Sequence, residues 1–170
     1  MLTKKMESAL NTQINEEFWA AYLYLSMSAY FTSEGFPGFA GWMHVQAQEE
    51  VTHAMKIYNY VLERGGKVAL EPLKAVATSW KSPLDVFQAS LEHEQKVTAM
   101  IDKLVEIAIE EKDHATRSML QWFIDEQVEE ESSAKTIIDS LKLIGDNGYG
   151  LYSIDKDLAS RTFVDETKES

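Results

Sequence analysis

Apolar residues recur at intervals of three and four along four long stretches of the chain, which is the spacing of one buried face of a helix. Short segments rich in Gly and Pro separate these stretches, among them "SEGFPGF" and "IGDNGYG". The pattern therefore predicts an all-α protein. We expect long helices at about 4–32, 38–64, 83–111 and 114–144, and a short fifth helix at about 154–162.

Several helix ends carry recognisable capping residues. Ser82 is placed as an N-cap, with Pro83 at the first helical position and the acid Asp85 in the first turn. Gly65 and Gly145 stand where glycine ends helices by adopting a left-handed conformation. The local signals thus agree with the boundaries expected from the apolar pattern.

The lengths of the connections predict how the helices are arranged. The first and second helices, and the third and fourth, are joined by only a few residues, so each pair should form an antiparallel hairpin. The second connection has nearly 18 residues and can reach roughly 55 Å, more than the roughly 40 Å length of a helix in this bundle. We therefore expect a four-helix bundle with one long crossover and with the second and third helices parallel.

Composition narrows the classes of function. The chain has 170 residues, the size of one domain, which we take to span 1–170, and it has no Cys for disulfides or thiolate metal sites. Its net charge of -12 argues against nucleic acid and anionic membranes as partners. The start "MLTKKMESAL" lacks the apolar core of a signal peptide, and no stretch is apolar enough to span a membrane. We expect a soluble, unprocessed, cytoplasmic protein.

Polar residues interrupt the apolar face of every long helix near its middle. At 1.5 Å per residue, these interruptions fall within about 5 to 6 Å of one level along the bundle. Glu50 and His53 are three residues apart and therefore lie on one helix face. In chain order, the residues at this level are Glu17, Glu50, His53, Glu94, Gln127 and Glu130.

Four carboxylates in an apolar interior cannot all stay ionised without a cation, because desolvation and mutual repulsion are both costly. No Lys or Arg occupies an inward position near this level. Carboxylates with imidazole in a four-helix core are the ligands of di-iron and di-manganese proteins. The sequence therefore predicts a di-metal centre, and an ordinary bundle whose acids are solvated is the non-enzymatic alternative.

A second layer of acids, Glu49, Glu126 and Glu129, lies beside the inward face. It is interpreted as a third metal site sharing Glu130, as an exit path for oxidised metal, or as a solvated helix face. Tyr24 and Trp122 are either core aromatics or rings that orient a ligand or supply an electron. The remaining histidines are assigned no chemistry; they are His44, His93 and His114.

A run of motifs in order covers nearly the whole chain: "ALNTQINEEFWAAYLYLSM", "GWMHVQAQEEVTHAMK", "ERGGKV", "LEHEQKVT", "EEKDHAT" and "FIDEQVEEE". With these motifs the sequence resembles the non-haem ferritins of the bacterial and archaeal type. The resemblance implies a ferritin-like fold and a hollow shell of twenty-four subunits. It also implies a ferroxidase centre in each bundle that oxidises Fe(II) with O2 or H2O2 and passes Fe(III) to a stored mineral.

The resemblance also implies roles for individual residues. The first iron would be held by Glu17, Glu50 and His53, and the second by Glu94, Glu130 and a bridging Glu50. Gln127 would be a weak ligand or a hydrogen-bond donor to one. The third iron site of this branch of the family would use Glu49, Glu126, Glu129 and Glu130. Tyr24 and Trp122 match aromatics beside the centre, and the short last helix resembles the one that lines the fourfold axis of the shell.

Departures from related families leave one enzymatic alternative. Bacterioferritins bind haem through a Met where this chain has Thr52, so we expect no haem. Rubrerythrins use two Glu-x-x-His motifs, whereas this chain has one, "EVTH", and no Cys. A di-iron peroxidase or oxidoreductase of rubrerythrin type, without storage, is the alternative to an iron-storage ferritin.

Overall fold

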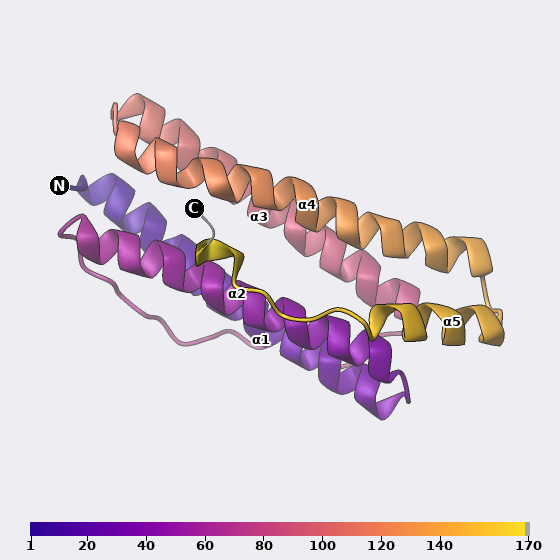
Figure 1. The fold of residues 1–170 in the computed structure, drawn as a ribbon. Helices are drawn as coiled ribbons and strands as arrows, with labels where there is room; N and C mark the ends of the chain where they lie inside the picture. Colours follow the sequence, from indigo (N-terminus) through magenta and orange to yellow (C-terminus); the bar gives the residue numbers. More distant parts are fainter. Residues whose placement is uncertain (169–170) are drawn as a thin grey trace.

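The computed structural model describes residues 1–168, so the last two residues of the predicted domain lie outside it. These residues form helices and connecting segments, with no β-strand among them (Figure 1). The all-α prediction is confirmed, and the four long helices agree with their predicted bounds to within one residue. The elements are α1 (Lys4–Ser33), α2 (Pro37–Glu63), α3 (Pro83–Glu110), α4 (His114–Ile144), α5 (Gly148–Leu158) and the 3-10 turn η1 (Glu166–Lys168).

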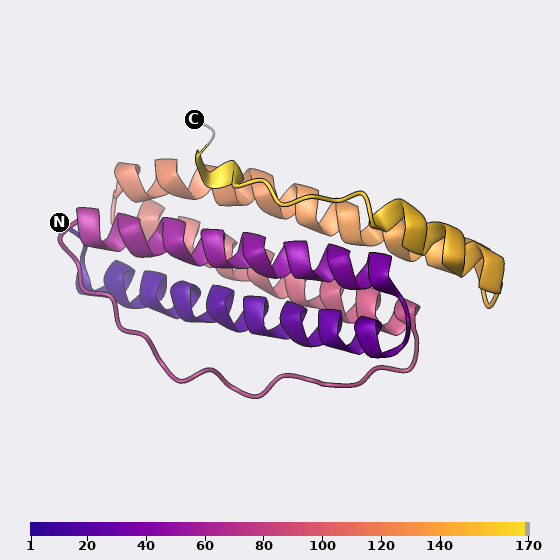
Figure 2. The ribbon, with the colours of Figure 1, turned by 60° about the horizontal axis from the view of Figure 1, so that its bottom comes forward.

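The long connection between α2 and α3 runs the length of the bundle, as Figure 2 shows. Asn11 and Asn15, four residues apart on α1, hold it in place. Asn11 donates to the carbonyl of Lys67 at 2.8 Å and accepts from the amide of Ala69 at 2.7 Å. Asn15 donates to the carbonyl of Ala69 at 2.9 Å and accepts from the amide of Glu71 at 2.8 Å. The crossover returns the chain to the end where α2 began, so α2 and α3 are parallel, as expected.

The apolar core is divided into two clusters, one toward each end of the bundle. One cluster contains Phe31, Phe39 and Phe87, and the other contains Leu10 and Leu120. All five of these side chains are buried. The polar residues predicted at mid-length lie between the clusters, so apolar packing at both ends can stabilise helices whose middle is costly to bury.

Capping at the ends of the long helices also follows the prediction. The Ser82 hydroxyl accepts from the amide of Asp85 at 3.1 Å. Gly65, two residues after the end of α2, and Gly145, directly after α4, have φ of 73° and 55°. Both angles lie in the left-handed region that glycine enters without strain. None of the described helices has the length and apolar character needed to cross a membrane.

The predicted bounds of the fifth helix are wrong: α5 begins at Gly148 and ends at Leu158, whereas we expected about 154–162. Two glycines in its first turn made this segment look like a loop. The Asn147 side chain caps the turn by accepting from the amide of Gly150 at 2.9 Å. A Cβ at Gly150 would lie 2.9 Å from Cβ of Ile144, so glycine permits α5 to pack against the end of α4.

Asp155 fixes α5 to the beginning of α2. Its Oδ1 accepts from the amides of Gly38 at 2.8 Å and Phe39 at 3.0 Å, and it therefore caps a helix whose own N-cap, Phe36, makes no side-chain hydrogen bond. A Cβ on Gly38 would lie 1.6 Å from the carbonyl oxygen of Asp155. Glycine is thus required for this contact, which directs residues 159–168 back along α2 (Figure 1).

The Gly38 contact generates a test of how α5 is anchored. Gly38→Ala should separate α5 from α2 and lower amide-exchange protection over residues 148–158, because the new methyl group overlaps a backbone carbonyl. The matched control is Gly41→Ala in the same helix, where nothing lies within 4 Å of the added Cβ. This control should raise stability by about 0.5–1 kcal/mol through helix propensity. Equal protection of α5 in both variants would contradict the anchoring role.

Candidate metal centre

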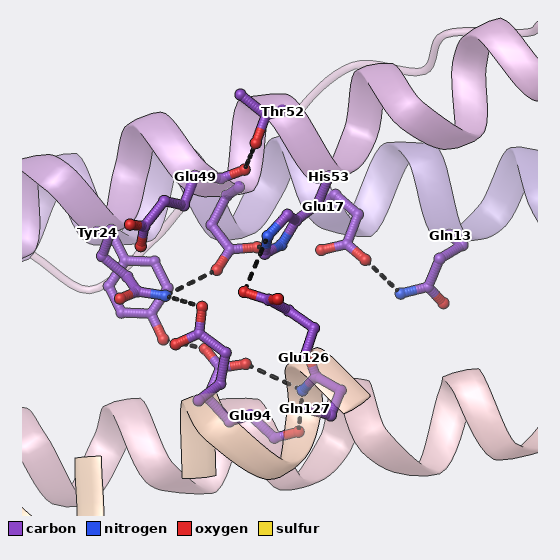
Figure 3. A network of polar contacts seen from close by, with 12 residues as sticks. Gln13, Glu17, Tyr24, Glu49, Thr52, His53, Glu94, Glu126 and Gln127 are labelled. Carbon is purple, nitrogen blue, oxygen red and sulfur yellow. Dashed lines mark hydrogen bonds and ion pairs between the residues drawn. The ribbon is translucent and has the colours of Figure 1, made fainter. Parts of the chain in front are cut away.

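A layer of buried polar side chains crosses the middle of the bundle (Figure 3). α1 contributes one of these residues, α2 two, α3 one and α4 two. Each is no more than 5% exposed, as expected of positions on the inward faces of the helices. The residues are Glu17, Glu50, His53, Glu94, Gln127 and Glu130.

Three of these residues converge as a potential metal-binding group. One ligand atom from each of Glu17, Glu50 and His53 lies within 4.8 Å of the others. His53 Nδ1 is 3.5 Å from Glu50 Oε2. Glu17 accepts a hydrogen bond from Gln13 at 2.8 Å through Oε1, but its buried Oε2 has no partner. A buried carboxylate oxygen without a donor is costly unless a cation binds there, so the group fits a metal.

His53 joins this group to a second one on α4. Ligand atoms of His53, Glu126 and Glu130 also lie within 4.8 Å of one another, and His53 Nε2 is 3.7 Å from Glu126 Oε1. The two ring nitrogens therefore face different carboxylates. Glu94 lies in the same layer, but Tyr24 donates a hydrogen bond to its carboxylate and Gln127 donates another at 3.2 Å. Gln127 thus occupies the hydrogen-bonding position expected of it.

Amide side chains orient the acids, and sequence reasoning assigned them no role. Gln46 donates through Nε2 to Glu130 Oε1 at 2.7 Å and to Glu50 Oε1 at 3.2 Å. Gln13 donates to Glu17 as described above. In both helices the Gln stands four residues before the Glu, on the same face. That spacing was the signal in the sequence from which these contacts could have been predicted.

Burial controls the protonation of the carboxylates. It raises the pKa of Glu94 to about 7, with the neighbouring charge of Glu17 adding to the effect. Burial and the charge of Glu94 likewise raise the pKa of Glu130 to about 8 and that of Glu50 well above its usual range. Protons therefore limit the charge of the layer, and a bound metal would replace them.

The pKa of His53 is also raised, but for a different reason. Burial alone would lower its pKa, but hydrogen bonds to Glu126 and Glu50 and the nearby carboxylate charges outweigh burial. The net result is a pKa raised well above the usual value of a histidine. The imidazolium form is thus a counter-charge for the surrounding acids in the metal-free protein. Metal binding requires this proton to leave.

The two predicted aromatic neighbours both contact the layer. The Tyr24 hydroxyl donates to Glu94 and lies 3.1 Å from Ser90 Oγ. Its pKa is raised well above the usual value by burial and by Glu94, so the phenol keeps its proton. The Trp122 ring centroid is 5.3 Å from that of His53, with the rings nearly perpendicular. Their redox roles stay predictions.

The outer acids do not behave as one group. Glu126 faces His53, as described above, whereas Glu49 pairs with Arg161 at 2.5 Å and Glu129 is exposed. Glu129 belongs to neither of the two groups found among residues 1–168. The third metal site stays a prediction. Arg161 follows α5 and stands outside the helical pattern that located the acids, so sequence reasoning did not anticipate its approach.

The other histidines lie away from the two groups. His44 and His114 are exposed, and His93 is buried beside Glu94 on α3. The His93 ring packs 5.4 Å from Trp19 and 6.2 Å from Tyr24, measured between centroids. Burial lowers its pKa to about 4, with the charge of Lys96 adding to the effect. A neutral imidazole in an aromatic environment agrees with the absence of a chemical assignment.

Carboxylates and an imidazole inside a four-helix bundle with one long crossover are typical of the ferritin-like class. Residues 7–144 match the family model described as a ferritin-like domain. The chain belongs to the ferritin family.

Proteins from bacteria and archaea share this similarity over nearly their whole length. A bacterial non-heme ferritin of Bacteroides fragilis is 46% identical over 161 residues, covering 95% of this chain and 100% of its own. One of Staphylococcus aureus is 45% identical over 166 residues, covering 98% and 100%. An open-pore ferritin structure from the archaeon Archaeoglobus fulgidus superposes with a TM-score of 0.94 at 50% identity, covering 95% and 100%.

The raised pKa of Glu94 generates a prediction for the metal-free protein. Between its ordinary pKa near 4.5 and about 7, the folded state holds a proton that the unfolded chain releases. The contribution of Glu94 to stability is therefore fully present below about pH 4.5 and is lost as the pH rises through about 7. Wild type should lose stability relative to Glu94→Gln over this range, because the amide cannot ionise.

Guanidinium unfolding of both proteins without metal, at several values from about pH 5 to about pH 8, measures this difference. Glu92→Gln, a change at an exposed neighbour on the same helix, is the control. The difference in stability between this variant and wild type should change little with pH. A stability difference between wild type and Glu94→Gln that is constant with pH would contradict the buried titration of Glu94.

Proposed function

We propose that this protein is an iron-storage ferritin of the cytoplasm. In this proposal it is a ferroxidase, which oxidises Fe(II) to Fe(III) with O2 or H2O2 at the centre inside each bundle, and it stores ferric mineral in a hollow shell of identical subunits. The observation that carries the proposal is the buried Glu17 oxygen without a hydrogen-bond partner, within reach of Glu50 and His53. The similarity to non-heme ferritins over almost the whole chain supports storage as the purpose of that site.

Iron is the substrate in this proposal, and the chain supplies two kinds of ligand, carboxylates and one imidazole. Glu17, Glu50 and His53 would hold the first ion, and Glu94 and Glu130 would hold the second, with Glu50 between them. Carboxylates are hard ligands and favour Fe(III) over Fe(II), so the site lowers the reduction potential of the bound iron. Two Fe(II) ions supply the two electrons that reduce O2 to peroxide or H2O2 to water.

The positions of the acids also suggest how product leaves. Glu126 contacts His53, and Glu129 on the same helix is exposed, so acids continue outward from the buried layer. Ferric ions would pass along these acids toward the mineral. A second site made only of carboxylates would hold iron less firmly than the site that includes His53, which suits a product that must be released.

Rapid mixing tests the centre directly. Metal-free protein loaded with Fe(II) without oxygen and then exposed to air should oxidise about two irons per chain in a fast phase, followed by slower mineral growth. Glu130→Ala should slow the fast phase at least about tenfold while folding is retained, because it removes a ligand. Glu106→Ala, an exposed acid on α3, is the control and should leave the rate unchanged.

Ferric absorbance by stopped flow and particle size by light scattering together separate the outcomes. An unchanged fast phase in Glu130→Ala would reject the site assignment. A small particle that consumes peroxide with a reductant and deposits no mineral would instead support the rubrerythrin-type alternative. A protein that binds no stoichiometric metal and gains no thermal stability from it would support the purely structural bundle.

Assembly into a shell is supported by exposed apolar residues on one face of the bundle. Tyr22, Leu25, Leu70 and Leu73 are 45% to 63% exposed and line an apolar groove of about 360 Å3 between α1, α2 and the crossover. A contiguous apolar patch of this kind marks an interaction surface. We propose that a second copy of the chain covers it, as part of the shell of twenty-four copies that the resemblance implies.

The groove generates a prediction about particle size. Leu70→Glu should yield smaller particles, because two facing copies would each bury an unpaired carboxylate. Light scattering and sedimentation measure the size, and far-UV circular dichroism checks that the bundle stays helical. Lys103→Glu, at an exposed position on α3 outside the groove, is the charge-changing control. Particles of wild-type size for Leu70→Glu would show that this face is not an interface.

A further inference from the structure

The segment that follows α5 returns along α2 to the middle of the bundle (Figures 1 and 2). Two of its contacts with α2 show where it lies. Arg161 lies over Trp42, with its guanidinium carbon 4.3 Å from the ring centroid. Farther on, Lys56 donates to the carbonyl of Thr167 at 3.4 Å. The segment is therefore held on both sides of the level at which the carboxylates meet.

The Arg161 guanidinium makes two kinds of contact there. Its Nη2 donates to Glu49 Oε2 at 2.5 Å. Its Nη1 donates to Gln46 Oε1 at 2.9 Å and to the carbonyl of Trp42 at 3.5 Å. Gln46 in turn donates to Glu130 and Glu50, at the distances given above. A chain of hydrogen bonds thus connects the C-terminal segment to two of the proposed metal ligands.

The side chains in this series of hydrogen bonds determine which group donates and which accepts. Arginine can only donate, whereas a glutamine amide accepts through oxygen and donates through nitrogen. Because Arg161 occupies the oxygen of Gln46, the amide nitrogen is turned toward the carboxylates. A reversed amide would direct its oxygen at Glu50 and Glu130, and when these carboxylates are ionised, as metal binding requires, two electronegative groups would face each other without a proton between them.

The site of Arg161 is built for a guanidinium in particular. Its guanidinium lies over an indole ring, and the fork of N–H groups reaches an amide and a carboxylate together. Its side chain is 24% exposed and that of Glu49 is 14% exposed, so the pair is shielded from solvent more than an ordinary surface ion pair. The charge of Arg161 also neutralises Glu49, the acid beside the layer that would otherwise attract a cation.

We infer that Arg161 is a positioning residue for the metal centre, which acts through Gln46 to orient Glu50 and Glu130. The C-terminal segment is then a functional part of the centre in each chain, in addition to being a connection. This inference rests on the proposed function, because the orientation of these carboxylates matters only if they bind metal.

A double-mutant cycle read out by Co(II) binding tests the inference without any redox step. Metal-free wild type, Arg161→Met, Gln46→Leu and the double variant are titrated with Co(II) under argon, following visible absorption. Arg161→Met should weaken binding at the lower-affinity site about tenfold and alter its absorption, because carboxylate orientation is lost. The double variant should bind like Gln46→Leu alone, because Arg161 acts through that amide.

Arg64→Met is the matched control. Arg64 also lies over an aromatic ring, 5.4 Å from the centroid of Tyr60, and pairs with Asp113 at 3.1 Å, but it stands at the far end of α2. It should lose stability without losing Co(II) affinity. The inference is overturned if Arg161→Met binds Co(II) within about twofold of wild type, if the two changes are additive, or if Arg64→Met causes the same loss.

The Co(II) titration, read together with the Fe(II) oxidation experiment, separates this inference from the proposed function. Wild type that binds Co(II) as expected but never oxidises Fe(II) would reject the ferroxidase and leave the role of Arg161 supported by the cycle. Wild type that oxidises Fe(II) while Arg161→Met retains full Co(II) affinity would reject only the positioning role. Wild type that binds no Co(II) would reject both.

Discussion

The free-energy cost of placing carboxylates in an apolar interior governs this structure. Each long helix contributes at least one acid to the central layer, and burial raises the pKa values of Glu50, Glu94 and Glu130. Protons, the His53 imidazolium and donating amides offset the charge in the metal-free chain. The apolar clusters on both sides of the layer supply the favourable burial that keeps the bundle folded around it.

Topology determines that these acids meet. Antiparallel hairpins alone could bring the acids of α1 and α2, or of α3 and α4, to one level. Joining the two hairpins with α2 parallel to α3 requires a connection as long as the bundle. The Asn11 and Asn15 side chains hold that connection against α1 through four hydrogen bonds to its backbone. The crossover therefore contributes to the centre although it supplies none of its proposed ligands.

The end of the chain is connected to the centre through a sequence of close contacts. Gly38 permits Asp155 to cap α2, this contact orients α5, and the segment after α5 reaches Trp42, Gln46 and Glu49 through Arg161. The acidic side of the centre thus has a cation of its own. Electrostatic balance at the proposed iron site depends on residues more than 100 positions apart in the chain, since the Arg161 and Gln46 contact spans 115.

Periodicity, capping residues and connection lengths determined the four long helices, their pairing and the buried level of Glu17, Glu50, His53, Glu94, Gln127 and Glu130. These features depend on spacing along one helix, which a sequence states directly. The motifs also carried the ferritin resemblance. Tertiary structure alone decided the contact of α5 with α2 through Asp155 and Gly38, the pairing of Glu49 with Arg161, and the approach of Arg161 to Gln46. Those outcomes depend on contacts between distant segments, and local spacing carries no record of such contacts until the helices have packed.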